Sequence, residues 1–232
     1  MNEYFDKIYV LSLRRSKDRR ETVSDRLKAV NIEFEFFDAY DGKVMNFIWN
    51  RLGNNYFKNP NYFACNVSHL AIYNDALSNG YKRILILEDD VKPHKDINTL
   101  FDMIKGNIPL DYDLLYLGYI PLNDREDEWD YNIFNDRYIS TNVFKAKNLW
   151  GLYSYSITEN LMRGLVDLYN SDFPMELDRY FVHNLQRTGD SFATSPQLFC
   201  HDITVSTNEE LIDYSSLRKS VDFRYADTSD YI

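Results

Sequence analysis

The apolar residues of this chain fall into short runs and helically spaced sets that alternate along its first half. Lys7 to Leu13 (KIYVLSL) is rich in β-branched and aromatic residues, which favours a strand. A helical pattern with Val23, Leu27 and Val30 follows, and Glu33 to Phe37 is typical of a second strand. The opening of the chain therefore predicts a β-α-β unit.

The clearest strand pattern is Arg83 to Leu87 (RILIL), whose four consecutive aliphatic residues show no polar alternation. Such a run is typical of a strand that is covered on both faces in the middle of a parallel sheet. A helix is predicted before it over residues 67–77, with Gly80 as a left-handed cap. After it we expect a helix over 97–104 and an apolar strand from Tyr112 to Gly118. This alternation predicts an α/β fold with a mixed, mainly parallel sheet flanked by helices.

The rest of the chain gives weaker patterns. Residues 40–62 are rich in Gly, Asn and aromatic residues, which indicates a surface excursion with a short helix around Phe47 to Leu52. Asn123 to Asp136 is acidic and lacks glycine, which favours a mobile or acceptor-facing loop. A single domain over residues 1–200 is expected, followed by a tail over 201–232 that packs on it or extends from it. The remaining predicted elements are strands over 138–144 and 152–157 and helices over 159–169 and 177–186.

Composition narrows the classes of function. The 232 residues include 19 tyrosines and 15 phenylalanines, enough for a core without disulfides, and the net charge is −10. That charge disfavours nucleic acid as a partner, so an anionic ligand needs a local basic pocket. Cys65 and Cys200 lie outside any CxxC spacing, so neither a zinc site nor a disulfide framework is indicated. No signal peptide or transmembrane segment is predicted, and a reduced, cytoplasmic setting is expected.

Three consecutive acids, Glu88, Asp89 and Asp90, directly follow the aliphatic run. Open α/β sheets bind ligands at the carboxyl ends of their strands, and clustered carboxylates there attract Mg²⁺ or Mn²⁺. In an extended chain residues i and i+2 share a side, so Glu88 and Asp90 are expected to face a metal together while Asp89 faces the other way. The alternative is a solvated acidic turn, which the triplet alone fits equally well; the hydrophobic run before it favours the metal site.

The segment ILILEDDV (84–91) resembles the LEDDV signature of glycosyltransferase family 25. Three other segments resemble that family in the same order and spacing, namely IYVLSLRRSKDRR (8–20), FFDAYDGK (36–43) and ACNVSHLAIY (64–73). Weaker likenesses follow at DLLYLG (113–118) and LYSYSIT (152–158), so the resemblance covers roughly residues 7 to 200.

The resemblance implies a GT-A-like fold that transfers a hexose, galactose or glucose, from a UDP-sugar to an acceptor hydroxyl with inversion. Glu88 and Asp90 would then meet the metal, Mn²⁺ or Mg²⁺, or the donor, with Asp89 close by. The acceptor would be a glycan, a lipopolysaccharide or a collagen-like peptide.

The basic loop after the first predicted strand would hold the nucleotide. By the resemblance, Leu13 and Arg14 would lie near the nucleotide, while Arg15 and Arg19 would neutralise its diphosphate. Each arginine, taken singly, is equally well explained as part of a solvated helix start.

The catalytic base is sought among the carboxylates in the second half. Asp178 resembles an Asp that the family places here and is the first candidate, with Glu176 second, although either could merely cap the helix they precede. His201 would complete the metal shell or would be a surface histidine. Ser68 with His69 is interpreted as structural, and Cys65 as a small buried apolar residue.

Two other classes of function stay open. A catalytically inactive, glycosyltransferase-like binding or adhesion module would keep the same fold. A metal-dependent phosphohydrolase or nucleotidyltransferase would use similar acids.

Overall fold

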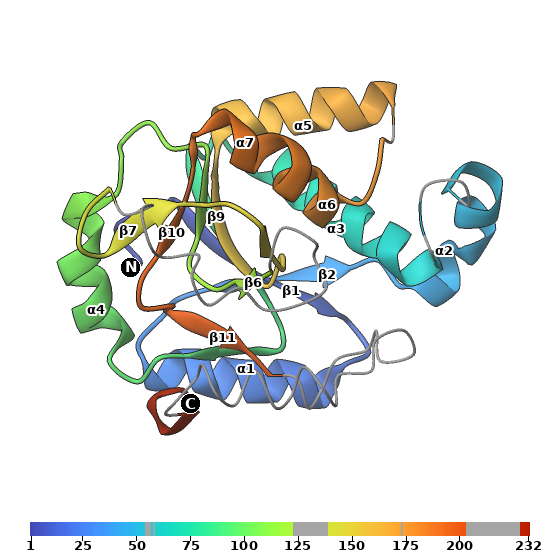
Figure 1. Ribbon diagram of the computed structural model, residues 1–232. Coiled ribbons are helices and arrows are strands. Elements are labelled where there is room, and N and C mark those ends of the chain that lie inside the picture. The colour runs from blue at the N-terminus through green and yellow to red at the C-terminus, as the bar shows by residue number, and fades with distance from the viewer. Residues whose placement is uncertain (54–56, 58, 123–138, 173, 203–227) are drawn as a thin grey trace.

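A seven-stranded sheet lies between two layers of helices (Figure 1). The computed structural model describes residues 1–53, 57, 59–122, 139–172, 174–202 and 228–232. The strand order is β2-β1-β3-β9-β5-β10-β7, and every strand except β9 and β7 runs in the same direction. The strands are β1 (Lys7–Leu13), β2 (Glu35–Ala39), β3 (Arg83–Glu88), β5 (Leu114–Tyr116), β7 (Val143–Lys145), β9 (Ser154–Thr158) and β10 (Ser191–Thr194).

Two small antiparallel pairs extend from the carboxyl edge of the sheet. The first joins β4 (Val91–Pro93) to β11 (Phe199–His201), and the second joins β6 (Ile120–Pro121) to β8 (Leu149–Trp150). The first pair brings a segment from far along the chain beside the residues that follow β3.

The helices cover both faces of the sheet. In Figure 1, α3 and α5 to α7 lie on one side of it and α1 on the other. The α-helices are α1 (Lys17–Ala29), α2 (Gly42–Ile48), α3 (Pro60–Ser78), α4 (Ile97–Ile104), α5 (Glu159–Ser171), α6 (Leu177–Tyr180) and α7 (Gln186–Thr188). Short π-helical turns occur at η1 (Trp49–Gly53) and η3 (Phe181–Leu185), and short 3₁₀ turns at η2 (Lys105–Asn107) and η4 (Thr228–Asp230). No helix in the described part of the chain is both long and apolar enough to cross a membrane.

The alternation of side chains along β3 explains why its sequence has no polar position. Ile84 and Ile86 join the core cluster that contains residues of α3 and α5. Leu85 and Leu87 point to the opposite face, where the cluster contains residues of α1 and α4. All four side chains are fully buried, so the strand is central, as predicted.

The predicted fold class is confirmed as an α/β fold with a mixed, mainly parallel sheet flanked by helices. One detail differs, because β3 pairs in parallel with β1 but antiparallel with β9. A strand that is buried on both faces has an apolar sequence whether the adjacent strand runs parallel or antiparallel to it. The sequence pattern therefore does not predict the direction of that adjacent strand.

Helix α3 begins earlier than the predicted residue 67. Pro60 occupies its first turn, and the Asn59 side chain caps it by accepting hydrogen bonds from the N–H groups of Asn61 and Tyr62 at 2.9 and 3.2 Å. Its end is as predicted, because Gly80 has a φ of +75° and closes a Schellman motif after Ser78.

Several predictions concern residues that lie outside the described part of the chain. These residues include the acidic loop over 123–136 and most of the tail over 201–232. The boundary at residue 200 stays a prediction. His201 ends β11, and the N–H of Ile232 donates to the carbonyl of Pro93 at 3.0 Å.

The central position of β3 makes a stability prediction. Leu85→Ala should lower the free energy of unfolding by about 3 kcal/mol, because it removes a fully buried side chain and leaves a cavity. Leu110→Ala is the matched control, since Leu110 is 87% exposed and should cost less than about 0.5 kcal/mol. Urea denaturation measures both, and equal losses would contradict the assignment of β3 as the core strand.

Candidate active site

Parallel pairing of β1 with β3 places the acidic triplet beside the end of the first strand. Leu11 lies opposite Glu88 in the register, so the next residues, Ser12 and Asp89, are neighbours. The Ser12 hydroxyl donates to Asp89 Oδ2 at 2.5 Å. The carboxyl ends of these two strands therefore form one edge, where the sequence predicted the site.

Arg19 supplies the positive charge at this edge. It stands in the first turn of α1, and its guanidinium forms ion pairs with Asp89 and, at 2.9 Å, with Oδ2 of Asp90. Asp89 and Asp90 are only 7% and 4% exposed. A buried carboxylate without such a partner would be strongly destabilising, so Arg19 compensates the charge that burial concentrates here.

The two aspartates respond differently to burial. Burial raises the pKa of Asp89 to about 6, and Arg19 and Ser12 offset only part of that effect. Burial also opposes ionisation of Asp90, but His201 and Arg19 together outweigh it and hold the pKa of Asp90 below its ordinary value. Asp90 therefore stays ionised to a lower pH than Asp89 does.

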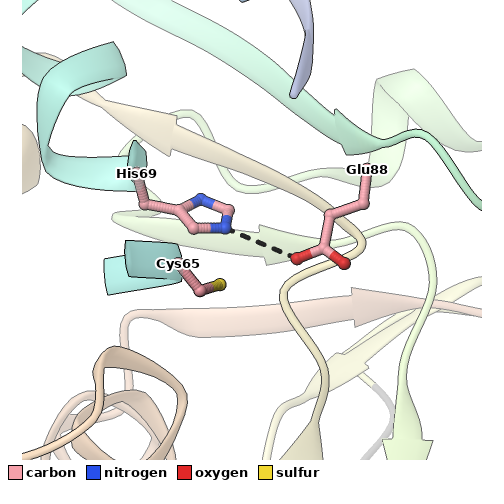
Figure 2. Close-up of side chains that lie close together, drawn as sticks. All are labelled: Cys65, His69 and Glu88. Carbon is pink, nitrogen blue, oxygen red and sulfur yellow. Dashed lines mark ion pairs between the residues drawn. The ribbon is translucent and has the colours of Figure 1, made fainter. Parts of the chain in front are cut away.

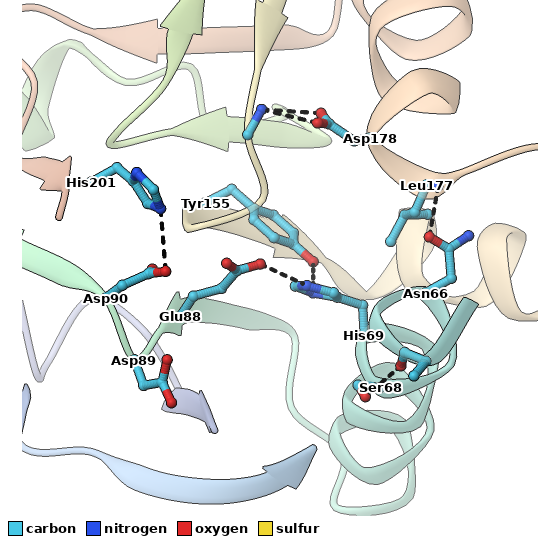
Figure 3. A network of polar contacts seen from close by, with 12 residues as sticks. Asn66, Ser68, His69, Glu88, Asp89, Asp90, Tyr155, Leu177, Asp178 and His201 are labelled. Atoms are coloured by element: carbon cyan, nitrogen blue, oxygen red, sulfur yellow. Dashed lines mark hydrogen bonds and ion pairs between the residues drawn. The ribbon is translucent and has the colours of Figure 1, made fainter. Parts of the chain in front are cut away.

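His201 reaches Asp90 through the pairing of β11 with β4. In that pair His201 lies opposite Val91, and the N–H of Asp202 donates to the carbonyl of Asp90 at 2.7 Å. The imidazole Nε2 then lies 3.2 Å from Oδ2 of Asp90 (Figure 3). Burial lowers the pKa of His201, but Asp90 and the other nearby acids raise it more, so it lies above the ordinary histidine value. The structure thus brings together two of the three predicted metal ligands.

Glu88 and Asp90 point away from the side on which Asp89 lies, as the extended spacing predicted (Figure 3). Glu88 Oε1 faces His69 Nε2 at 3.5 Å. On the other side, the Oδ1 atom of Asp90 is buried and no donor within the described residues reaches it. An ionised oxygen without a donor is suited to a divalent cation, so the residues fit the metal that the sequence implied.

The Ser-His pair has two different roles. Ser68 is structural, as predicted, because its hydroxyl donates to the carbonyl of Ala64 at 2.6 Å and accepts the N–H of Tyr40 at 2.9 Å. His69 is also fully buried, but it faces Glu88 at the site. Sequence reasoning missed this contact, since nothing in a helical Ser-His pair indicates which strand end lies opposite it.

Asp178 lies on a third side of the site, in the first turn of α6. The N–H of Gly151 donates to both its carboxyl oxygens, at 3.1 and 3.2 Å (Figure 3). Gly151 has a φ of +100°, and a Cβ there would meet the Tyr153 ring at 2.8 Å, so this position requires glycine. Asp178 is thereby oriented from a neighbouring loop.

A buried amide anchors the segment that carries Asp178. Asn66 in α3 donates to the carbonyl of Met175 at 3.3 Å and accepts the N–H of Leu177 at 3.0 Å. Glu176 stands at the N-cap of α6 but makes no side-chain capping bond; its carboxylate lies 3.5 Å from Nε of Arg179. The capping alternative for Glu176 is therefore not what the structure has.

Burial gives Asp178 an unusual acidity. Burial raises the pKa of Asp178 to about 7; the Gly151 N–H acts against this, and the charges of Glu88 and Glu176 reinforce it. A carboxyl with a pKa near neutrality can exchange a proton at physiological pH, which is the property required of a general base.

The other residues of the basic loop lie next to the acidic edge, but not all of them point at it. Leu13 ends β1 and is half-buried, and Arg14 is exposed. Arg15 Nε pairs with Asp41 Oδ2 at 2.6 Å, toward the start of α2. Of the predicted nucleotide-binding arginines, Arg19 is the one in contact with the acidic triplet.

Comparison with known proteins gives one strong family match. The sequence profile described as "Glycosyltransferase family 25 (LPS biosynthesis protein)" matches residues 5–181. The chain is 27% identical over 140 residues to the probable inactive glycosyltransferase 25 family member 3 of Bos taurus, covering 53% of this chain and 23% of that protein. It is also 27% identical over 139 residues to procollagen galactosyltransferase 2 of Mus musculus, covering 53% of this chain and 22% of that protein.

The sequence matches cover only part of each relative. The chain spans about a quarter of the length of these curated relatives. A solved structure described as a glycosyltransferase involved in the glycosylation of the major capsid of PBCV-1 aligns with 88% of this chain and 96% of its own, at 14% identity and a TM-score of 0.44. A likeness at that level carries no argument about function.

The acidity of Asp178 predicts a pH dependence of stability. Its pKa of about 7 in the folded protein exceeds the ordinary value of 3.8, so between these pH values the unfolded chain binds fewer protons and stability falls as pH rises. Asp178→Asn keeps an oxygen for the Gly151 N–H and removes this titration. The unfolding free energy of the wild type relative to the variant should fall by on the order of 4 kcal/mol from pH 4 to pH 8. Urea denaturation across this range is the test, and parallel pH profiles would contradict the assignment.

Proposed function

The chain belongs to glycosyltransferase family 25, and from that premise we propose that it transfers a hexose from a UDP-sugar to an acceptor hydroxyl with inversion, in a metal-dependent reaction. The observation that carries the proposal is the acidic edge, where Asp90 is held by Arg19 and His201 and keeps one buried oxygen that no donor among the described residues reaches. In a solvated acidic turn the carboxylates would stay in water, because burying them costs free energy.

The donor would bind along the edge formed by β1 and β3. Asp90 and His201 would hold Mn²⁺ or Mg²⁺, with Glu88 joining them by rotating away from His69. The metal would offset the negative charge of the departing diphosphate. Leu13 and Arg14 would contact the nucleotide, and Arg14 is free of the ion pairs that hold Arg15 and Arg19 within the described chain.

Two residues that sequence analysis assigned to the donor site would act through charge. Arg19 would lie close enough to the diphosphate to share its positive charge between that group and the aspartates. Asp89, bonded to Ser12 and Arg19, would hold this arginine in place. Arg15 would need to leave Asp41 before it could contribute.

Asp178 is the proposed general base, with Glu176 as the second candidate. Inversion requires the acceptor oxygen to attack the sugar from the face opposite the diphosphate and to lose its proton as it does so. The pKa of Asp178, about 7, suits it to take that proton at neutral pH. The hydrogen bond from Gly151 and the anchoring of the segment by Asn66 would fix the direction of its carboxylate.

Galactose is the sugar that the relatives favour, because one of them is a procollagen galactosyltransferase, and glucose is the alternative. The acceptor would be a glycan, a lipopolysaccharide, as the family description suggests, or a collagen-like peptide.

An inactive binding module is the second candidate, because another relative is described as a probable inactive member of the family. Donor binding without hydrolysis or transfer would support it. A phosphohydrolase or nucleotidyltransferase would instead cleave a phosphate bond of the nucleotide-sugar, and product analysis separates these reactions.

The metal assignment predicts the behaviour of Asp90→Asn. In the presence of Mn²⁺ this variant should bind UDP at least about tenfold more weakly than the wild type, because it loses a charged ligand. Titration calorimetry with UDP, with and without Mn²⁺, measures the effect, and circular dichroism verifies the fold. Asp102→Asn, a change at an exposed acid of α4, is the matched control. Absence of Mn²⁺-dependent UDP binding in the wild type, or equal affinity in Asp90→Asn, would refute the metal site.

If Asp178 is the general base, its substitution should lower turnover without changing the affinity for UDP. Asp178→Asn should reduce kcat for hydrolysis of UDP-galactose with Mn²⁺ by about 10²- to 10⁴-fold and leave UDP affinity unchanged, because the residue acts on the attacking hydroxyl only. Asp167→Asn, an exposed position on α5, should change neither quantity. Turnover equal to wild type would remove Asp178 as the base.

A further inference from the structure

A second group of metal-binding side chains lies on the α3 side of the acidic edge. Cys65 and His69 are four residues apart in α3, so they share one face of the helix, and Glu88 extends toward them from the end of β3. Figure 2 shows all three side chains directed at one point. The Cys65 sulfur, one His69 nitrogen and one Glu88 oxygen lie within 4.8 Å of one another. Within the described residues, no other group of three side chains drawn from Asp, Glu, Cys and His meets this distance.

The imidazole is oriented for this point by its other nitrogen. His69 Nδ1 is hydrogen-bonded to the Tyr155 hydroxyl at 2.8 Å, and that hydroxyl is bonded to the Tyr73 hydroxyl at 2.6 Å. His69 Nε2 is fully buried and makes no hydrogen bond within the described chain, although Glu88 Oε1 is 3.5 Å away. The tautomer that donates from Nδ1 leaves a lone pair on Nε2 aimed between Cys65 and Glu88. Metal-binding histidines are commonly held in this way.

We propose that Cys65, His69 and Glu88 form a binding site for Zn²⁺. Thiolate, imidazole and carboxylate are the ligands that zinc prefers, and three protein ligands leave a fourth position for water. Ligands at about 2.0–2.3 Å from a tetrahedral ion are separated by roughly 3.3–3.8 Å. The distance between His69 Nε2 and Glu88 Oε1 already lies in that range, and Cys65 Sγ, which is within 4.8 Å of both atoms, would have to move closer to them.

The electrostatic surroundings favour a cation at this point. Burial, followed by the charges of Glu88, Asp178 and Asp90, raises the pKa of the Cys65 thiol well above its usual value. The same negative potential attracts a divalent ion, which lowers the pKa of a bound thiol. Binding breaks the S–H bond and forms the sulfur–zinc bond, the proton passes to solvent, and no atom changes oxidation state.

The site is distinct from the manganese site proposed at Asp90 and His201, although Glu88 belongs to both. A cysteine ligand selects zinc or cobalt over manganese, which prefers oxygen. The inference therefore does not depend on sugar transfer, and it can be tested without any nucleotide.

The test uses Co²⁺ as a spectroscopic substitute for Zn²⁺ in the purified full chain. The wild type should show a sulfur-to-cobalt charge-transfer band that Zn²⁺ abolishes by displacement. Cys65→Ser should lose the band and bind Zn²⁺ at least about tenfold more weakly in calorimetry. Cys200→Ser is the matched control, because it removes the other thiol, buried on β11, and should keep the band.

The outcomes are distinguishable. No band in the wild type, a measurement that needs no variant, would overturn the proposal, as would a band retained in Cys65→Ser or lost in Cys200→Ser. Asp90→Asn should keep the band even though it impairs Mn²⁺-dependent UDP binding, so failure of the zinc site and failure of the transferase site give different patterns.

Discussion

Compensation of buried negative charge is the constraint on which this site depends. The β3 strand delivers three acids to one edge, and two of them are almost completely removed from water. Burial of an unpaired carboxylate costs several kcal/mol, so the fold is stable only if cations are brought to meet them. Arg19 arrives from the helix that follows β1, and His201 arrives on β11. Two elements that are far apart in the sequence, α1 and β11, therefore both supply a cationic side chain to the end of β3.

The triplet is divided among three environments. Glu88 faces the buried imidazole of α3, Asp89 faces Ser12 and Arg19, and Asp90 faces Arg19 and His201. The pKa values differ accordingly, since that of Asp89 is raised and that of Asp90 is lowered. Three chemically similar neighbours therefore have distinct properties because β3 ends at Glu88 and the turn that follows gives each side chain a different set of partners.

The sequence predicted those features that local patterns encode. The aliphatic run of β3, the acids after it, the left-handed Gly80 and the limits of α4 are all written in neighbouring residues. The strands β4, β6, β8, β10 and β11 were missed, because two to four residues are too few to show a period.

Local sequence patterns also do not predict contacts between segments that are distant in the chain. The spacing of the cysteines by itself indicates no zinc site, and it carries no information on side chains that a helix and a strand end bring together, such as Cys65, His69 and Glu88. The capping of α3 by Asn59 was hidden in a stretch whose composition indicates a loop. The roles proposed for Asp178 and Arg19 came from resemblance, and the residues that contact them, Gly151 and Asp90, became visible only in three dimensions.

The pairing of β4 with β11 has a consequence for the order in which the protein is made. Asp90 leaves the ribosome more than a hundred residues before His201, its imidazole partner. During synthesis the nascent sheet can therefore form around β1 and β3 while one of its acids still lacks half of its neutralising contacts. That carboxylate should remain hydrated until β11 emerges and docks, so the acidic edge is completed late in synthesis.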